Sequence, residues 1–145
     1  MINLLVNCKQ GKDGQLKVLI IDDCILIGKK LKELISENIS VHILGQAKSV
    51  GEALQMFHEF DPDITFLDIN LPDGNGYDTL IHLKRLKPTL KVVVFSNSAN
   101  AFYKRKFAEM GSDYFLDKSK DFSKIPETIN QIISAMTKNN TKNIY

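Results

Sequence analysis

Residues 17–23 read KVLIIDD, an apolar run that ends in two carboxylates. A second run, residues 64–68, reads ITFLD and ends in the same way. Short apolar runs that are rich in β-branched and aromatic residues are typical of buried strands in a parallel sheet. The carboxyl ends of such strands form the edge at which open α/β folds bind their ligands. We therefore predict that Asp22, Asp23 and Asp68 lie together at one edge of a sheet.

Two further apolar runs end in reactive side chains. Residues 92–95 read VVVF and precede Ser96, and residues 114–117 read YFLD and precede Lys118. If these runs are strands of the same sheet, a hydroxyl and an ammonium join the three carboxylates at its edge.

Stretches with helical periodicity alternate with the strand-like runs from residue 17 onward, and residues 41–47 supply one more strand. This alternation gives five βα units and predicts an α/β fold with a doubly wound, five-stranded parallel sheet and right-handed crossovers. Apolar residues at helical spacing mark four of the predicted helices. These residues are Ile27, Leu31, Leu34 and Ile35 in the first, Val50, Ala53, Leu54 and Phe57 in the second, Tyr77, Leu80, Ile81 and Leu83 in the third, and Ile125, Ile129, Ile132, Ile133 and Met136 in the fifth, over residues 122–136. The fourth helix is predicted over roughly Ser98 to Met110.

Several residues mark where these helices begin and end. Ser49 is placed to cap the second helix, and Asp61-Pro62-Asp63 should break it. Gly111 follows the fourth helix, where a glycine commonly ends a helix.

Length and composition suit one globular domain, because 145 residues can bury a substantial core. We predict that the domain spans residues 17–137, after an N-terminal extension over residues 1–16 and before a polar C-terminal tail over residues 138–145. Both ends are polar, and we expect them to be mobile or loosely packed.

Charge, cysteine usage and hydropathy indicate which partners and which compartment to expect. The formal net charge of +2 gives no reason to expect nucleic acid as a partner. Cys8 and Cys24 lack metal-ligand spacing and are expected to be free thiols in a reducing compartment. The chain has neither a membrane-spanning run nor a signal peptide pattern, so we expect a cytoplasmic protein.

The acidic residues at the strand ends favour a metal ion. Three crowded carboxylates repel one another unless a cation compensates their charge. Oxygen ligands without histidine or thiolate favour a hard ion, and Mg²⁺ is the expected cofactor. Taken one at a time, each Asp could instead cap a helix, Lys118 could be a solvated surface lysine, and Ser96 could be a helix cap.

The same residues could support phosphoryl transfer. A carboxylate can attack phosphorus and form an acyl phosphate. The metal ion and Lys118 would offset the charge on the transferred group, and Ser96 could donate a hydrogen bond to it.

Residues 17–137 resemble the receiver domain of bacterial two-component response regulators, in particular chemotaxis-type single-domain receivers. The resemblance rests on Asp22-Asp23 after the first strand, on Asp68 after the third, and on Ser96 and Lys118 after the fourth and fifth. Pro72 and Gly76 also fall where that family places a proline and a turn glycine.

The resemblance implies a (βα)₅ flavodoxin-like fold and assigns roles to these residues. Asp68 would be the phospho-acceptor, and Asp22 or Asp23 would bind Mg²⁺ together with Asp68 and the backbone carbonyl of Asn70. Lys118 would pair with the phosphoryl group, Ser96 would be the switch hydroxyl, and Phe115 would be the aromatic switch residue.

The resemblance also implies a signalling role. A sensor histidine kinase or a phosphotransfer protein would phosphorylate Asp68, and the chain would catalyse only its own phosphorylation and slow autodephosphorylation. Phosphorylation would switch the face formed by the fourth helix, the fifth strand and the fifth helix for an unidentified output partner. That face would include residues 102–106, FYKRK, which could bind an acidic partner. The protein would be a monomer or a phosphorylation-dependent dimer.

Other functions are less well matched. A haloacid-dehalogenase-type phosphatase needs Asp-x-Asp, but the second position is Asn70. A flavodoxin needs a hydroxyl-rich phosphate loop after the first strand, where this chain has Asp22-Asp23. A non-phosphorylated pseudo-receiver that only binds other proteins, or the N-terminal fragment of a longer DNA-binding regulator, stays an alternative.

Overall fold

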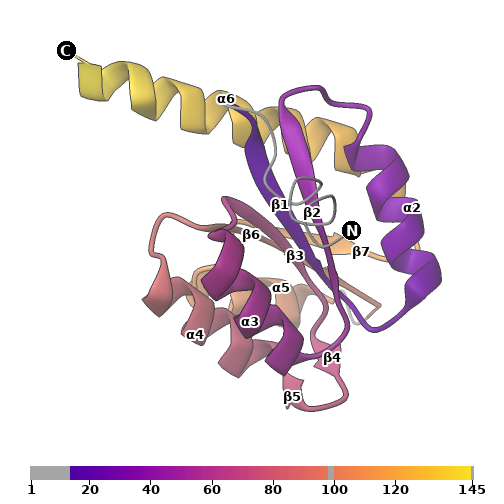
Figure 1. The fold of residues 1–145 in the computed structure, drawn as a ribbon. Helices are drawn as coiled ribbons and strands as arrows, with labels where there is room; N and C mark the ends of the chain where they lie inside the picture. Colours follow the sequence, from indigo (N-terminus) through magenta and orange to yellow (C-terminus); the bar gives the residue numbers. More distant parts are fainter. Residues whose placement is uncertain (1–13, 98–99, 145) are drawn as a thin grey trace, which may run out of the picture.

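The computed structural model of the protein describes residues 14–97 and 100–144. Its centre is a five-stranded parallel sheet, which confirms the predicted fold class (Figure 1). The strands lie in the order β2-β1-β3-β6-β7 and comprise β1 (Leu16–Ile21), β2 (Val41–Ala47), β3 (Ile64–Leu67), β6 (Lys91–Ser96) and β7 (Tyr114–Asp117).

Helices cover both faces of the sheet (Figure 1). One face carries α3 (Val50–Phe60), α4 (Gly76–Leu86) and α5 (Ala101–Glu109). The other face carries α2 (Ile25–Ile35) and α6 (Ile125–Ile144), which follows a short 3₁₀ turn, η1 (Phe122–Lys124). This two-sided cover explains why β1, β3 and β6 contain near-continuous apolar runs.

The core consists of two apolar layers, one on each side of the sheet. Successive side chains of a strand point to opposite faces, so Leu19 and Ile21 pack beneath α3 to α5 while Val18 and Ile20 pack beneath α2 and α6. All four side chains are fully buried, and the burial of each stabilises the fold by roughly 1.5–3 kcal/mol. These strands therefore hold their carboxyl ends rigidly in place.

The predicted helix boundaries at Ser49, Asp61 and Gly111 are confirmed. The side chain of Ser49 accepts a hydrogen bond from the Glu52 N–H and caps α3. Asp61 ends α3 in the left-handed conformation, with a φ of 48°. Gly111 follows α5 with a φ of 107°, which glycine adopts without steric cost.

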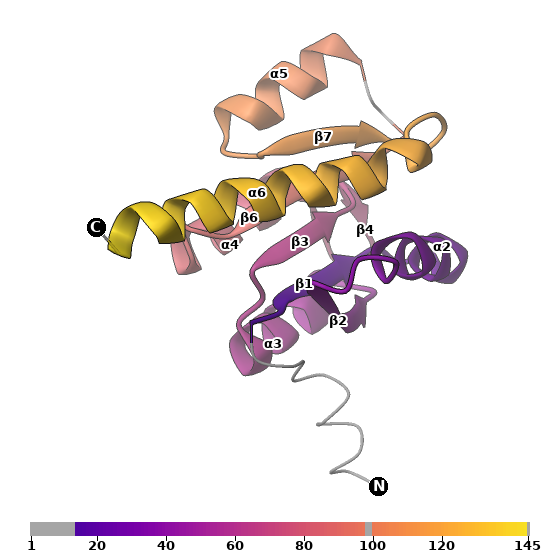
Figure 2. The same cartoon turned by 90° about the horizontal axis from the view of Figure 1, so that it is seen from above.

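Other parts of the fold differ from the predictions. Helix α5 begins at Ala101 rather than Ser98, because the side chain of Asn100, in extended backbone conformation, caps it by accepting the Tyr103 N–H. A small antiparallel hairpin, β4 (Asn70–Leu71) and β5 (Gly74–Asn75), follows β3 and was not predicted. Helix α6 continues to Ile144 instead of ending near Met136 (Figure 2).

The predicted ends of the domain are only partly covered by the structure. The N-terminal extension lies outside the described residues up to residue 13, and β1 begins at Leu16. Helix α6 runs past the predicted boundary at residue 137, and the division into domain and tail stays a prediction. Among the described helices, none combines the length and the apolar character needed to cross a membrane.

Candidate functional site

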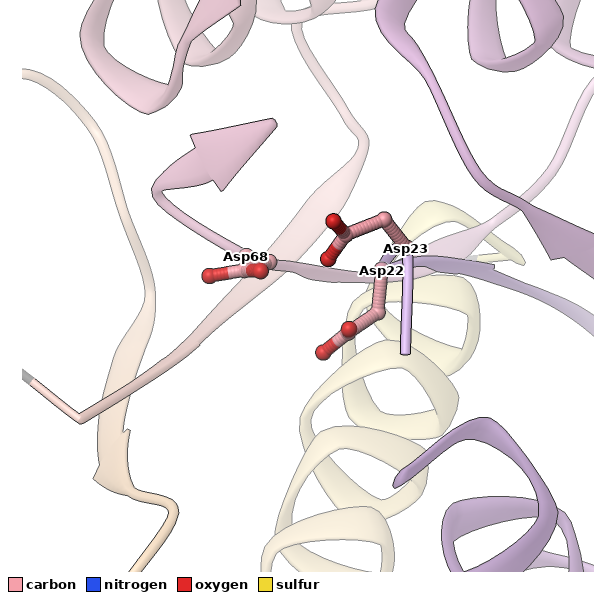
Figure 3. A group of neighbouring side chains, drawn as sticks. All are labelled: Asp22, Asp23 and Asp68. Carbon is pink, nitrogen blue, oxygen red and sulfur yellow. The ribbon is translucent and has the colours of Figure 1, made fainter. Parts of the chain in front are cut away.

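Three carboxylates gather at the carboxyl ends of β1 and β3. These strands are neighbours in the sheet and pair Ile21 with Leu67, so the residues that follow them emerge side by side. One carboxylate oxygen from each of Asp22, Asp23 and Asp68 lies within 4.8 Å of the others. Figure 3 shows the three side chains projecting to the same side of the strand ends. The sheet thus brings together the acidic residues that the sequence singled out.

Asp22 and Asp23 occupy different environments. Asp22 is buried, its Oδ1 accepts the Cys24 N–H at 2.9 Å, and its Oδ2 lies 2.7 Å from the Lys118 Nζ. Asp23 is exposed. Asp22 is therefore held by the protein on both oxygens, whereas Asp23 faces water.

Lys118 joins the two buried carboxylates. It follows β7, and its Nζ lies 2.7 Å from Asp22 Oδ2 and 3.2 Å from Asp68 Oδ2. Burial acts most strongly on Lys118 and favours its neutral form, but the hydrogen bond to Asp22 and the charges of Asp68 and Asp22 outweigh it and raise its pKa. Lys118 is therefore charged at neutral pH and forms one ion triad with the two aspartates.

Asp68 is under opposing influences. Its burial raises the pKa most, and the nearby charge of Asp22 raises it further. The Lys118 ammonium and the Asn70 N–H, which donates to Asp68 Oδ1 at 3.2 Å, lower it without cancelling the effect of burial. The net pKa of Asp68 lies above its usual value, so its negative charge is incompletely compensated by the protein.

Ser96 and Phe115 lie on the strands beside this triad. Ser96 is the last residue of β6, is fully buried, and accepts the Lys118 N–H through its backbone carbonyl at 3.1 Å. Phe115 lies on β7, half-buried, with its ring 5.7 Å from that of Phe107 on α5. Ser96 thus binds the backbone of Lys118, and Phe115 lies three residues before Lys118 in the chain.

A turn after β7 fixes Lys118, and the contacts that form this turn were not predicted. Asp121 Oδ2 accepts the Asp117 N–H at 2.8 Å, and Asp117 Oδ1 accepts the Ser119 N–H at 2.7 Å and the Ser119 hydroxyl at 2.5 Å. The pattern Asp117-x-Ser119 is typical of an Asx turn and could have revealed the second of these contacts. The contact between Asp117 and Asp121 depends on how the chain turns after β7, and no sequence pattern predicts it.

A second missed residue ties the acidic edge to α3. Asp73, in the loop between β4 and β5, accepts the Val50 N–H at 2.7 Å and the Gly51 N–H at 3.1 Å at the start of α3. These two hydrogen bonds lower the pKa of Asp73 below its usual value. The loop that follows Asp68 is thereby anchored to a neighbouring helix.

The donor set fits a hard cation. Three carboxylates and one ammonium leave two negative charges at the site. All the clustered donors are oxygens, and one of the carboxylates is exposed. Oxygen-only sites with open positions suit Mg²⁺, which keeps several of its own waters.

Comparison with known proteins identifies the family. Residues 18–130 match the family described as the response regulator receiver domain. The chain belongs to this family. Receiver domains are signalling domains of two-component systems that interact with histidine kinases or phosphotransfer proteins, and they generally bind Mg²⁺ at an acidic cluster.

Relatives of this receiver domain include both longer and similarly sized proteins. The sensory transduction protein LytT of Bacillus cereus is 36% identical over 114 residues, which cover 79% of this chain and 46% of LytT. The chemotaxis protein CheY of Thermotoga maritima is 28% identical over 116 residues, which cover 80% of this chain and 96% of CheY. The chain therefore spans less than half the length of LytT but nearly the whole length of CheY.

Solved structures show the same fold. A CheY-like receiver domain protein from Methanospirillum hungatei superposes with a TM-score of 0.77 at 22% identity and covers 86% of this chain and 98% of that one. A receiver domain of a LuxO-type repressor from Vibrio parahaemolyticus superposes with a TM-score of 0.79 at 16% identity and covers 88% and 96%. At these identities the similarity establishes the fold alone.

Proposed function

We propose that this receiver domain accepts a phosphoryl group on Asp68. The observation that carries the proposal is the bridge of Lys118 Nζ between Asp22 and Asp68, which places one buried cation beside the candidate nucleophile. The donor is a phosphohistidine of a sensor histidine kinase or a phosphotransfer protein. A carboxylate oxygen of Asp68 attacks phosphorus and forms a P–O bond. The P–N bond breaks, its electron pair returns to the imidazole, and the histidine leaves neutral because its other nitrogen keeps its proton.

The side chains around Asp68 have separate tasks in this proposal. Lys118 keeps its positive charge and pairs with the phosphoryl oxygens, as a compact ammonium on a flexible stem can do. Ser96, at the end of the adjacent strand β6, donates its hydroxyl hydrogen to the same group. Phe115 then turns inward as the switch residue.

The proposal includes a divalent cation at the acidic cluster. Asp22, Asp23, Asp68 and the backbone carbonyl of Asn70 would hold Mg²⁺. When bound, Mg²⁺ would neutralise charge on the transferred phosphoryl group. The support comes from the donor set: two excess negative charges and carboxylate oxygens within 4.8 Å of one another.

In this proposal, phosphorylation changes the surface formed by α5, β7 and α6, and this surface binds the output partner. Residues 102–106 lie on α5, where Phe102 is 67% exposed and Lys104, Arg105 and Lys106 are exposed. An exposed aromatic ring among three cations suits a partner with an acidic surface. We further propose that the chain acts in the cytoplasm, as a monomer or a phosphorylation-dependent dimer.

The direct test is phosphorylation by acetyl phosphate in the presence of Mg²⁺, followed by intact-mass measurement. The wild type should gain the mass of one phosphoryl group, and Asp68→Asn should gain none. Asp78→Asn is the matched control, because Asp78 is an exposed carboxylate on α4. It should be phosphorylated like the wild type. A wild type that gains no mass would contradict the proposal and favour a pseudo-receiver.

A further inference from the structure

Gln46 reaches from β2 to the backbone of the acidic loop. Its Nε2 donates to the Asp22 carbonyl oxygen at 2.7 Å and to the Cys24 carbonyl oxygen at 2.9 Å. These two residues flank Asp23, so one carboxamide group holds both sides of the segment that carries the exposed carboxylate. Two carbonyl dipoles that point at one donor repel each other if the donor is removed, and the loop would then relax by rotating its peptides.

Gly28 makes room for this carboxamide. It is a buried residue of α2, and a Cβ atom placed on it would overlap the Oε1 and Cδ atoms of Gln46. Glycine is otherwise a poor residue inside a helix. The pairing of Gly28 with Gln46 therefore indicates that this space is kept for the Gln46 side chain.

The contacts of Gln46 complete the restraint on Asp22. The Asp22 N–H donates to the Ala47 carbonyl of β2 at 2.9 Å, and the Asp22 carboxylate is held by the Cys24 N–H and by Lys118. Gln46 restrains the Asp22 carbonyl, which is the start of the peptide that leads to Asp23. Strand β2 thus fixes the backbone of the acidic loop from one side while Lys118 fixes its carboxylate from the other.

We propose that Gln46 is a positioning residue for the metal site: its carboxamide, admitted by Gly28, sets the direction in which Asp22 and Asp23 present their carboxylates. The inference rests on the proposed function, because it takes Mg²⁺ as the ion at the acidic cluster. Partners that orient metal ligands without touching the metal typically change affinity 10–100-fold when they are lost. Gln46 acts on the ligand backbone, so we expect the lower end of this range.

The test is an NMR titration of the full chain with MgCl₂, since the chain contains no tryptophan to report binding. Gln46→Met keeps the length of the side chain and removes the donor. Gly28→Ala leaves every donor and ligand in place but displaces the flexible end of Gln46. Each should weaken Mg²⁺ binding about tenfold. The control is Gln55→Met, at an exposed glutamine of α3, which should bind Mg²⁺ like the wild type.

Two further readouts separate positioning from a structural role. Thermal unfolding without Mg²⁺ should show that Gly28→Ala is fully folded at the temperature of the titration, since the preference of alanine for the helix offsets part of the cost of the hydrogen bonds that the displaced Gln46 gives up. In a Gln46→Ala background, Gly28→Ala should have no additional effect on Mg²⁺ affinity, because the side chain that it displaces is gone. An equal loss in both backgrounds would show that Gly28 acts through α2 itself and would overturn the inference.

The remaining outcomes distinguish this inference from the proposed function. Wild-type binding together with unchanged affinity in Gln46→Met and Gly28→Ala would overturn the inference alone. A wild type that binds no Mg²⁺ would contradict the metal site of the proposed function. In that case amide hydrogen exchange at Cys24, whose N–H donates to Asp22, still tests Gln46. Faster exchange in both variants would support its role in ordering the loop, and unchanged exchange would overturn it.

Discussion

Asp68 is the residue at which stability and the proposed function conflict. Its burial opposes ionisation, and Lys118 compensates the charge only in part. A nucleophile must nevertheless be ionised to attack phosphorus. The folded protein therefore holds the ionised carboxylate where ionisation is less favourable than in water, a cost that is common at functional sites.

This conflict predicts that Asp68→Asn stabilises the protein in metal-free buffer. Asparagine resembles the neutral acid and removes the repulsion from Asp22. The free energy of unfolding at pH 7, measured by urea denaturation with EDTA, should rise by up to about 1 kcal/mol, a value that allows for screening by water.

The pH dependence of this gain follows from the raised pKa of Asp68. The destabilisation by the wild-type carboxylate is complete above its folded pKa. It shrinks as the pH falls and is absent below the unfolded pKa of about 3.9, where the group is protonated in both states. The difference between Asp68→Asn and wild type should therefore vanish at acidic pH. A variant that is less stable than the wild type at pH 7 would show that the pairing with Lys118 outweighs burial.

At the scale of single elements, the turn over residues 117–121 determines where Lys118 lies. Asp121 accepts the Asp117 N–H, and this hydrogen bond is the main reason that the pKa of Asp121 is lowered. Lys118 follows Asp117 in the chain, and the Lys118 N–H donates to the Ser96 carbonyl. Hydrogen bonds therefore hold the backbone N–H groups of both Asp117 and Lys118, and this fixes the position from which the ammonium extends.

Asp121→Ala should loosen this turn. It leaves the buried Asp117 N–H without its acceptor and should lower the free energy of unfolding at pH 7 by about 1 kcal/mol or more. Phosphorylation by acetyl phosphate should also slow, because Lys118 is less well placed. Lys120→Ala, at an exposed residue of the same turn, is the control and should change neither.

The Asp121 carboxylate should stabilise the protein at neutral pH, whereas the Asp68 carboxylate should destabilise it, because the pKa of Asp121 is lowered and that of Asp68 is raised. A carboxyl with a lowered folded pKa stabilises the protein fully above its unfolded pKa of about 3.9 and loses this effect as the pH falls through the folded pKa. Urea denaturation at pH 7 and near pH 3 should show the larger difference at pH 7. A larger difference at the acidic pH would contradict the role assigned to the Asp121 carboxylate.

At the scale of the whole molecule, the sheet connects the acidic edge to the proposed output face. Strand β6 ends at Ser96, pairs with β7, and so joins the site to α5 and α6. In Figure 2, α5 and α6 flank β7. A change at Ser96 therefore has a short path to the surface that includes Phe102.

Ser96→Ala should separate phosphorylation from switching. The variant keeps Asp68 and Lys118 and should be phosphorylated by acetyl phosphate, but it lacks the hydroxyl that would engage the phosphoryl group. NMR spectra before and after phosphorylation should show amide shift changes on α5 in the wild type, and changes smaller by roughly half or more in Ser96→Ala, as a population shift of a two-state element predicts. Equal shifts in both proteins would contradict the switch role of Ser96.

The fold and the composition of the site could be predicted from the sequence because both depend on local patterns. The run over residues 64–67 had to be a buried strand, and Asp68 had to follow it at the sheet edge. The bridge of Lys118 to Asp22 was not predicted, because it depends on side-chain directions across the sheet. The contacts of Gln46 and Asp73 likewise join residues more than twenty positions apart, which no periodicity records.

The central claim is that Asp68, and neither Asp22 nor Asp23, receives the phosphoryl group. The most direct measurement is to phosphorylate the protein with acetyl phosphate and Mg²⁺, to reduce the acyl phosphate with borohydride, and to locate the resulting homoserine by peptide mass spectrometry. We predict that homoserine replaces aspartate at position 68 alone. Homoserine at position 22 or 23, or at none of the three, would contradict the assignment.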